Sequence, residues 1–335
     1  AQVVLSTRLR SGDFRMVQPA TAGSYDTARY GTLYDAHFDS SGRRLATASA
    51  DHVVRIWAAD RREVLSELRG HKSPVLSLSW PHGRFAALLA SGAADGHVVV
   101  WREAKSGEWQ IAHQINVTGS VSTIAFCPPE YGLALAVAGM DALGVLTILT
   151  RRGNDIGLPA QGGAEQWQAK AFPAHEGGVA SLSWSPSASP ATLATGPAVS
   201  RATALALRRL ATGGVDGSIC IWHGDPKTES WTRQHMLADE KHQGPIRSVA
   251  WRPNAGIPSS LLATCTQTGT VATWAQDMEG QPWRLRCSWS VVGDARRLTW
   301  SKAGTLLGVS VGDSISFLYR EGPGGSWEQT EISEE

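Results

Sequence analysis

Residues 69–109 read RGHKSPVLSLSWPHGRFAALLASGAADGHVVVWREAKSGEW. Three short apolar runs end near Trp80, Gly92 and Trp101, and a fourth run opens at Trp109. The Asp-Gly pair at residues 95–96, between the second and third runs, is a strong signal for a tight hairpin turn. The stretch therefore predicts four short strands joined by turns. Because such a unit cannot bury both of its faces alone, we expect the chain to contain copies of it.

Copies of this unit recur along the chain at a spacing of about 45 residues. The third run of each copy ends in a marker residue, at Trp57, Trp101, Leu149, Trp222, Trp274 and Tyr319. The first run ends in an aromatic residue in every copy, at Phe38, Trp80, Phe126, Trp184, Trp251 and Trp300. Four strands per unit at this period are typical of WD-repeat β-propellers. The sequence thus predicts an all-β, six-bladed propeller.

The composition narrows the classes of function. The chain has 335 residues, and its 31 basic and 30 acidic side chains give a formal net charge of +1. This balance argues against a dominant attraction to nucleic acid or to an anionic membrane. The four cysteines lack the spacing of a metal site or a redox pair, which fits a reducing compartment. No apolar run reaches the length of a membrane span, and the first residues lack the core of a secretory signal.

The chain divides into an N-terminal extension, residues 1–31, and a repeat region, residues 32–335. Long loops are predicted at about 151–166 and 185–208 within the repeat region. The extension is expected to hold one strand, either at residues 3–6 or at residues 14–17, and the small and polar residues between Val17 and Gly31 are expected to form a loop. Because each repeat has its own fourth strand, this strand is left over. It would be the fourth strand of a seventh blade whose other three strands are missing.

Two of the repeats carry a complete set of polar residues. The sets are His71, Ser91, Asp95 and Trp101 in the second blade, and His175, Thr212, Asp216 and Trp222 in the fourth. Hydroxyl, imidazole and carboxylate are also the groups of a hydrolase triad. Their recurrence favours a structural role, in which they form a buried hydrogen-bond chain from the indole N–H to the carboxylate. We therefore predict a protein that is not an enzyme, with no catalytic residue, metal or cofactor.

Several segments go beyond a generic WD repeat and resemble a known family. They include LRGHKSPVLSLSW at 68–80, FCPPEYGLALAVAGMDALGVLTIL at 126–149, PAHEGGVASLSWSPS at 173–187 and VAWRPNAGIPSSLLATCTQTGTVATW at 249–274. Over roughly residues 30–327 the chain resembles the Sec-thirteen family, the small propeller subunits shared by the COPII outer coat and the Y-complex of the nuclear pore. The LTIL third strand, the insertion after SWSPS and the GIPSS loop are the most specific marks.

The resemblance implies a scaffold subunit whose open propeller is completed by a blade inserted from a partner. The implied partners are a large COPII outer-coat subunit of the Sec-thirty-one type and a scaffold nucleoporin of the Y-complex, with no nucleic acid. The implied hetero-oligomers lie in two places. One is the cytoplasmic side of the endoplasmic reticulum and of the COPII vesicle, where the chain meets the membrane only peripherally, through the coat. The other is the nuclear pore complex in the nuclear envelope. The alternatives are a Seh-one-type nucleoporin and a closed adaptor propeller that binds peptides.

An inserted blade would need apolar residues on the two blade faces that lack a neighbour. The expected partner-binding residues are Val54 and Ile56 on the first blade, Ile315 and Phe317 on the last, and Val3, Val4 and Leu5 on the leftover strand. The unpaired edge of that strand would also favour strand addition from another chain.

Overall fold

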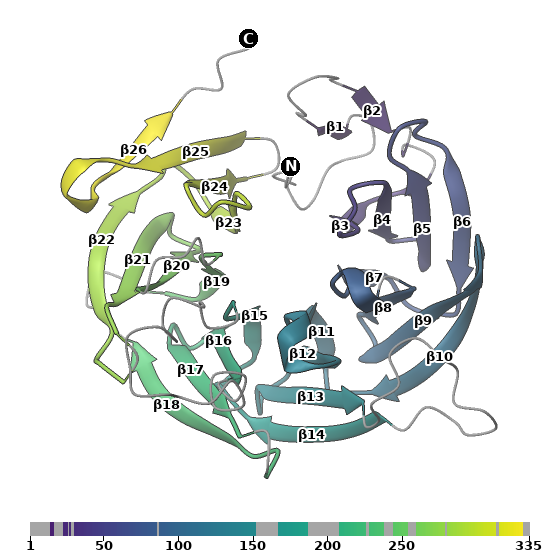
Figure 1. The fold of residues 1–335 in the computed structure, drawn as a ribbon, viewed down its shortest axis with the longest axis horizontal. Coiled ribbons are helices and arrows are strands. Elements are labelled where there is room, and N and C mark those ends of the chain that lie inside the picture. The colour runs from purple at the N-terminus through teal and green to yellow at the C-terminus, as the bar shows by residue number, and fades with distance from the viewer. Residues whose placement is uncertain are drawn as a thin grey trace. The chain divides into compact units, whose positions relative to one another are not determined.

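The computed structural model describes 14–16, 23–25, 27, 30–85, 87–151, 167–186, 208–225, 228–237, 244–253, 259–278, 280–312 and 315–330. Within these residues the chain forms six four-stranded antiparallel sheets and one two-stranded sheet (Figure 1). Each four-stranded sheet is called a blade here, and the blades are numbered one to six in chain order. The chain divides into two compact units, one of Thr7–Val179 and one that includes Ala180–Glu335.

The first unit contains the two-stranded sheet and blades one to three. The two-stranded sheet pairs β1 (Phe14–Met16) antiparallel with β2 (Gly23–Tyr25). The blades are β3 (Leu33–Phe38), β4 (Arg44–Ser49), β5 (Val53–Ala58) and β6 (Val64–Arg69); β7 (Val75–Ser79), β8 (Leu88–Ala93), β9 (His97–Lys105) and β10 (Glu108–Asn116); and β11 (Ser120–Phe126), β12 (Ala134–Met140), β13 (Val145–Arg151) and β14 (Trp167–Pro173). Two 3-10 turns, Gly83–Phe85 and Pro129–Tyr131, lie between first and second strands.

The second unit contains blades four to six, and the unit boundary falls at the start of β15. These blades are β15 (Val179–Trp184), β16 (Arg208–Gly214), β17 (Ile219–Gly224) and β18 (Trp231–Leu237); β19 (Ile246–Trp251), β20 (Ser260–Thr266), β21 (Thr270–Gln276) and β22 (Arg284–Ser290); and β23 (Ala295–Trp300), β24 (Leu306–Val311), β25 (Ile315–Glu321) and β26 (Trp327–Thr330). A 3-10 turn, Pro323–Gly325, precedes β26. In both units each strand pairs with its neighbour in the chain, as hairpin connections require.

Within each unit the buried core lies between consecutive blades, and strand alternation decides which side chain meets which blade. Val54 and Ile56 of β5 share a buried cluster with Val99 and Trp101 of β9. The equivalent residues of β17 and β21 share a cluster in the second unit. The marker residue of a third strand and the residue two before it therefore face the preceding blade. The residues one and three before the marker face the following blade.

The structure confirms the all-β fold with six blades of four strands. The Asp-Gly turn of blade two is also as predicted, because Gly96 has a φ of 81° and a Cβ there would lie 2.4 Å from the carbonyl oxygen of Val117. A strand at residues 14–16 was one of the two expected for the extension, but β2 lies in a stretch predicted to be loop. Residues 3–6, and nearly all of the two predicted loops, lie outside the described residues.

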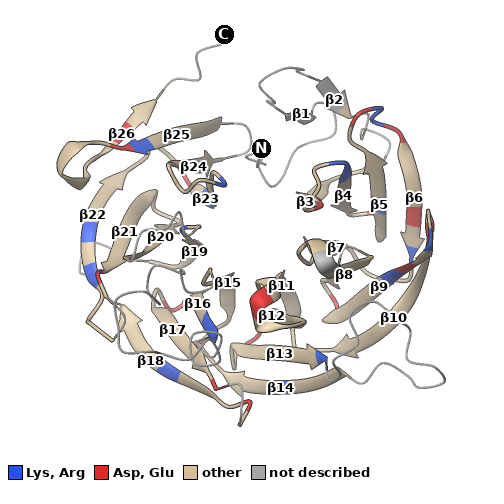
Figure 2. Cartoon of the chain, viewed as in Figure 1, with Lys and Arg blue, Asp and Glu red and all other residues tan. Residues whose placement is uncertain are grey.

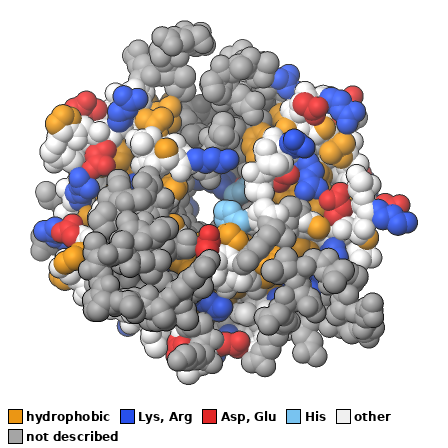
Figure 3. Space-filling view, in the orientation of Figure 1, with side chains coloured by type: hydrophobic (Ala, Val, Ile, Leu, Met, Phe, Trp, Pro, Cys, Tyr) orange, Lys and Arg blue, Asp and Glu red, His pale blue; other side chains and the backbone are white. Residues whose placement is uncertain are grey.

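Charged side chains are spread over the blades with both signs interspersed. Figure 2 shows basic and acidic residues on strands and turns of both units, and Figure 3 shows them among apolar and neutral side chains on the face in view. Neither picture shows a continuous patch of one sign among the described residues. No helix in the described part of the chain has the length and apolar character needed to cross a membrane.

Candidate partner-binding surfaces and polar networks

A buried indole-to-hydroxyl hydrogen bond joins the second and third strands in four blades. The Nε1–H of the marker tryptophan donates to the Ser or Thr ten residues earlier: Trp57 to Thr47 at 2.9 Å, Trp101 to Ser91 at 2.8 Å, Trp222 to Thr212 at 2.8 Å, and Trp274 to Thr264 at 3.0 Å. A buried indole N–H left without a partner would cost about 1–3 kcal/mol. These bonds therefore favour the structural role predicted for the recurring hydroxyls.

In blade two the chain of polar groups continues to His71 but stops there. The Nε2 of His71 lies 2.6 Å from the Oγ of Ser91. Its Nδ1 is buried and has no hydrogen-bond partner among the described residues, whereas Asp95 accepts the backbone N–H of His97 at 3.1 Å. The expected bond between Asp95 and His71 is thus absent from the described network, because the carboxylate caps its own turn. Burial, with the charge of His97, lowers the pKa of His71 from 6.5 to about 4.

In blade four the carboxylate of Asp216 likewise accepts hydrogen bonds from its own turn. Asp216 accepts the backbone N–H of Ser218 at 2.9 Å and its hydroxyl at 2.8 Å. His175 is buried, but it belongs to the first unit, and its pairing with Thr212 stays a prediction. Among the described residues no group of three or more His, Cys, Asp or Glu side chains is placed to hold a metal ion.

The faces assigned to Val54 and Ile56 in the sequence are wrong by one strand position. Both side chains are buried, at 0% and 1% exposure, in the cluster between blades one and two. They face the following blade and are not available to an inserted one. Because successive side chains of a strand point to opposite faces, the side that meets a preceding blade carries Arg55 and Trp57.

Blade six shows the same one-position error. Phe317 is half-buried and packs on the cluster between blades five and six, so it faces the preceding blade. Ile315 is 55% exposed at the start of β25. It lies two residues before Phe317, so its side chain points to the same side of the strand. The residues of β25 that point the other way include Leu318, which is half-buried. Val3, Val4 and Leu5 lie outside the described residues, and their role stays a prediction.

The N-terminal segment covers part of the face of blade one that meets a preceding blade. The ring of Tyr25 makes an edge contact with Trp57 at a centroid distance of 5.6 Å, and its hydroxyl donates to the carbonyl of Ala59 at 3.3 Å. Tyr30 also meets Trp57 edge-on, at 5.9 Å. The guanidinium of Arg55 lies 3.6 Å from the centroid of the Tyr30 ring, a close cation–π contact.

Two carboxylates neutralise the buried Arg55. Its Nη2 lies 2.6 Å from Asp51 Oδ2, and its Nε lies 3.0 Å from Glu67 Oε1. Although burial alone would raise the pKa of Asp51, hydrogen bonds from Arg55 and Ser49 lower it. The sequence carried a signal for this group, since an arginine interrupts the apolar run VVRIW, but its partners could not be chosen from sequence alone.

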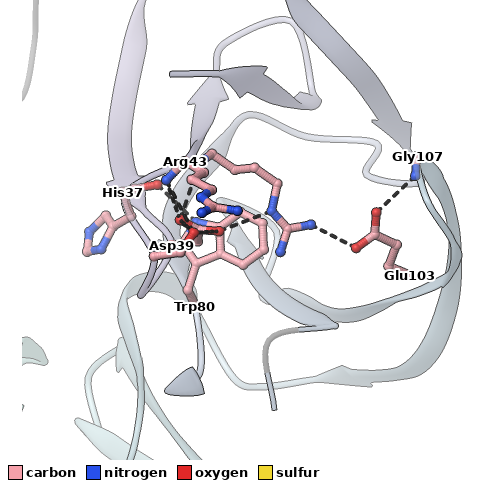
Figure 4. A network of polar contacts seen from close by, with 8 residues as sticks. His37, Asp39, Arg43, Trp80, Glu103 and Gly107 are labelled. Atoms are coloured by element: carbon pink, nitrogen blue, oxygen red, sulfur yellow. Dashed lines mark hydrogen bonds and ion pairs between the residues drawn. The ribbon is translucent and has the colours of Figure 1, made fainter. Parts of the chain in front are cut away.

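A second arginine links blades one and two at the β3–β4 turn (Figure 4). Arg44 pairs with Asp39 at 3.1 Å and with Glu103 of β9 at 2.7 Å. Its guanidinium lies 5.0 Å from the ring centroid of Trp80, whose Nε1–H donates to the carbonyl of His37 at 2.9 Å. Figure 4 shows Asp39 beside the turn at Arg43, and Glu103 reaching the backbone of Gly107. These contacts fix the seam between the two blades and present no reactive group.

The chain is similar to proteins of known families. The family "WD domain, G-beta repeat" matches residues 23–58, 62–102 and 167–223. "Protein SEC13 homolog" of Drosophila melanogaster is 33% identical over 306 residues, which cover 90% of this chain and 81% of the relative. "Protein transport protein sec13" of Emericella nidulans is 33% identical over 315 residues, covering 90% and 95%. "Protein transport protein SEC13" of Coccidioides immitis is 32% identical over 329 residues, covering 96% and 100%.

A solved structure shows the same fold at much lower sequence similarity. A chain of the "Crystal Structure of Mitotic Checkpoint Complex" superposes with a TM-score of 0.67 and 15% identity, covering 94% of this chain and 86% of that one. At that identity the likeness concerns the fold alone.

Proposed function

This chain belongs to the SEC13 (Sec-thirteen) family of WD-repeat proteins, and from that premise we propose that it is a non-catalytic scaffold subunit in protein transport. Its assembly is the outer cage of the COPII coat in transport from the endoplasmic reticulum to the Golgi, and also the Y-complex of the nuclear pore. In each assembly a large partner inserts a seventh blade, which completes the open propeller. The partners are a coat subunit of the Sec-thirty-one type and a scaffold nucleoporin.

The observation that carries this proposal is the place of β2 in the repeat pattern. Two of the three matches to the WD family begin at the fourth strand of a blade: residue 62 lies just before β6, and residue 167 opens β14. The remaining match begins at residue 23, the first residue of β2. By this register β2 is the fourth strand of a blade that precedes blade one. In the described chain its sheet contains only β1 besides itself, so inner strands from another chain would complete it.

Purification of the tagged chain from its own cells tests the proposal directly. We expect large subunits of both partner types to co-purify, in separate complexes that gel filtration resolves. Co-expression with the partner's blade segment should also raise the melting temperature of the chain, because a partner that binds only the folded state stabilises it by mass action. Recovery of the chain alone, with no large subunit and no stabilisation by the segment, would falsify the proposal.

A pair of N-terminal truncations tests the role given to β2. Removal of residues 1–13 keeps both strands of the two-stranded sheet, whereas removal of residues 1–25 deletes both strands and Tyr25. We expect the shorter truncation to bind the partner segment as the full chain does, and the longer one to bind at least tenfold more weakly. Equal binding by both truncations would show that β2 is not part of the completed blade.

A further inference from the structure

The first strands of consecutive blades are joined by a ladder of side-chain oxygens that accept backbone N–H groups. In every seam within a unit, an oxygen on the first strand of one blade accepts from the first strand of the next: Asp35 from Leu78 at 2.9 Å, Ser77 from Ile124 at 3.1 Å, Ser79 from Phe126 at 2.9 Å, Ser181 from Val249 at 3.1 Å, Ser183 from Trp251 at 2.9 Å, and Ser248 from Leu298 at 3.1 Å. The first strands of neighbouring blades belong to different sheets and do not pair with each other through their backbones. The side-chain oxygens therefore satisfy backbone N–H groups that would otherwise be buried without a partner.

The acceptors occupy two fixed positions relative to the aromatic residue that ends the first run. One is three residues before it, as in Ser181, and the other is directly before it, as in Ser183. In β23 these positions hold Arg297 and Thr299, counted from Trp300. Since a guanidinium has donors and no acceptor, Thr299 is the residue of this pair that can continue the ladder.

Thr299 points to the side of blade six that no described blade of its own unit covers. Its neighbours Leu298 and Trp300 belong to the cluster shared with blade five, so strand alternation turns Thr299 the other way. The side chain is half-buried, and within the described residues its hydroxyl has no hydrogen-bond partner. The equivalent hydroxyls of Ser79 and Ser183 both hold a backbone N–H of the next blade.

At the other ladder position, three residues before the aromatic, blade one needs no acceptor from a preceding blade. In blades two, three, five and six, the residue two before the aromatic donates its N–H to the preceding blade of the same unit. In β3 the equivalent residue is Ala36, and its N–H donates at 3.0 Å to the carboxylate of its own neighbour, Asp35. The other oxygen of Asp35 accepts from Leu78 of blade two. The first strand of blade one is thus satisfied locally at this position.

We propose that the hydroxyl of Thr299 accepts a backbone N–H from the innermost strand of the inserted blade, and so fixes the register of that strand against blade six. This inference rests on the proposed function, and it names the residue of blade six that receives the partner. The occupant is an extended strand of another polypeptide, because only a backbone N–H at ladder spacing fits the pattern of the four seams. Since the acceptor binds main chain, it sets register and not side-chain preference.

The test compares Thr299→Val with Thr299→Ser in the full chain, with the blade-donating segment of the Sec-thirty-one-type coat subunit as the probe. Valine keeps the shape of threonine and removes the acceptor, whereas serine keeps the hydroxyl. Loss of one hydrogen bond should weaken binding about fivefold in Thr299→Val, and Thr299→Ser should stay within about twofold of wild type. As a matched control, Ser183→Ala removes a ladder bond inside the chain and should lower its melting temperature, whereas Thr299→Val should leave the melting temperature of the isolated chain unchanged.

The outcomes separate this inference from the proposed function. If wild type does not bind the segment, the proposed function fails and this inference fails with it. If wild type and Thr299→Val bind equally well, the inserted-blade function stands and the role of Thr299 is wrong. Weaker binding by Thr299→Ser than by Thr299→Val would also overturn it, because the hydroxyl would then not be the group that matters.

Discussion

Blades one and two differ at the third-strand position that faces a preceding blade. In blade two this residue is Val99, which is fully buried against Val54 and Ile56 of blade one. In blade one it is Arg55, which is held by two carboxylates and covered by the ring of Tyr30. At this position the seam between blades one and two is thus apolar, whereas the side of blade one that meets the N-terminal segment is charged and aromatic.

The difference distinguishes a blade face that meets another blade from one that meets the N-terminal segment. Cross-strand pairing sets the chemistry, because Arg55 lies opposite Glu67 and Val99 lies opposite Gln114. A buried arginine is tolerated only where carboxylates compensate its desolvation, and blade one supplies two. An apolar face of the same size, left without a neighbour, would favour non-specific association. A paired charge avoids that and still accepts specific aromatic contacts.

The largest effect is expected from placing the residue of blade one in blade two. Val99→Arg would bury a guanidinium opposite Gln114 and against Val54 and Ile56, with no cross-strand carboxylate to neutralise it. We expect a loss of about 3–5 kcal/mol in the free energy of unfolding, measured by chemical denaturation. Val99→Met, of similar length and uncharged, is the control and should cost far less. Equal stability of the two variants would mean that the seam tolerates charge.

The reverse exchange should have a smaller effect. Arg55→Val removes the cation from Asp51 and Glu67, whose side chains are 32% and 34% exposed and can be partly rehydrated. We therefore expect a loss of about 2–3 kcal/mol in the free energy of unfolding, below the range for breaking a fully buried pair. Arg55→Lys keeps the charge but not the fork that bonds both carboxylates, and it should be intermediate. A neutral or stabilising Arg55→Val would show that the two blades do not differ in the way described.

The repeat itself could be predicted from sequence because its signals lie at fixed spacing. The structure has the marker tryptophans, the hydroxyl ten residues before each of them and the Asp-Gly turn at the positions that the repeat pattern predicts. The faces of β5 could not be read in the same way, because all six of its residues are buried and its apolar residues do not alternate with polar ones. The apolar pattern alone points to Val54 and Ile56 as partner-binding residues. Arg55 is the residue that distinguishes this strand from the third strand of blade two, where Val99 stands at the same position.

The contacts that sequence missed depend on where neighbouring chain segments lie. Asp95 and His71 are both present at the expected spacing, but whether the carboxylate reaches the imidazole or its own turn depends on the local turn geometry. The serines of LSLSW were visible as alternate polar residues in a buried strand. Their role as acceptors requires the backbone of the next blade to be in place, and no spacing within one strand records that. Tyr25 and Tyr30 lay in a stretch expected to be loop.

The two blades also differ at the position of the buried histidine. His71 stands twenty residues before Ser91 in blade two, and the residue at the same offset from Thr47 in blade one is Thr27, which is also buried. Blade two therefore has a titratable group in this place and blade one does not. The comparison predicts that acid lowers the stability of the chain through His71 of blade two, a titratable group that blade one lacks.

The smallest of the three effects is this loss of stability in acid. His71 has a pKa of about 4 in the folded chain, against 6.5 when unfolded, because burial and His97 disfavour its charged form more than Asp95 favours it. The unfolded chain thus binds a proton between these values and the folded chain does not, so the contribution of His71 is complete above pH 6.5 and is lost as the pH falls toward 4. We expect about 2 kcal/mol between pH 7 and pH 5. His71→Gln removes the titrating group, and it can also change the stability at every pH by a constant amount. The measurement is therefore the slope of the unfolding free energy against pH, compared between wild type and His71→Gln. Identical slopes for wild type and His71→Gln would mean that folding does not shift the pKa of His71, and that burial does not keep the imidazole neutral.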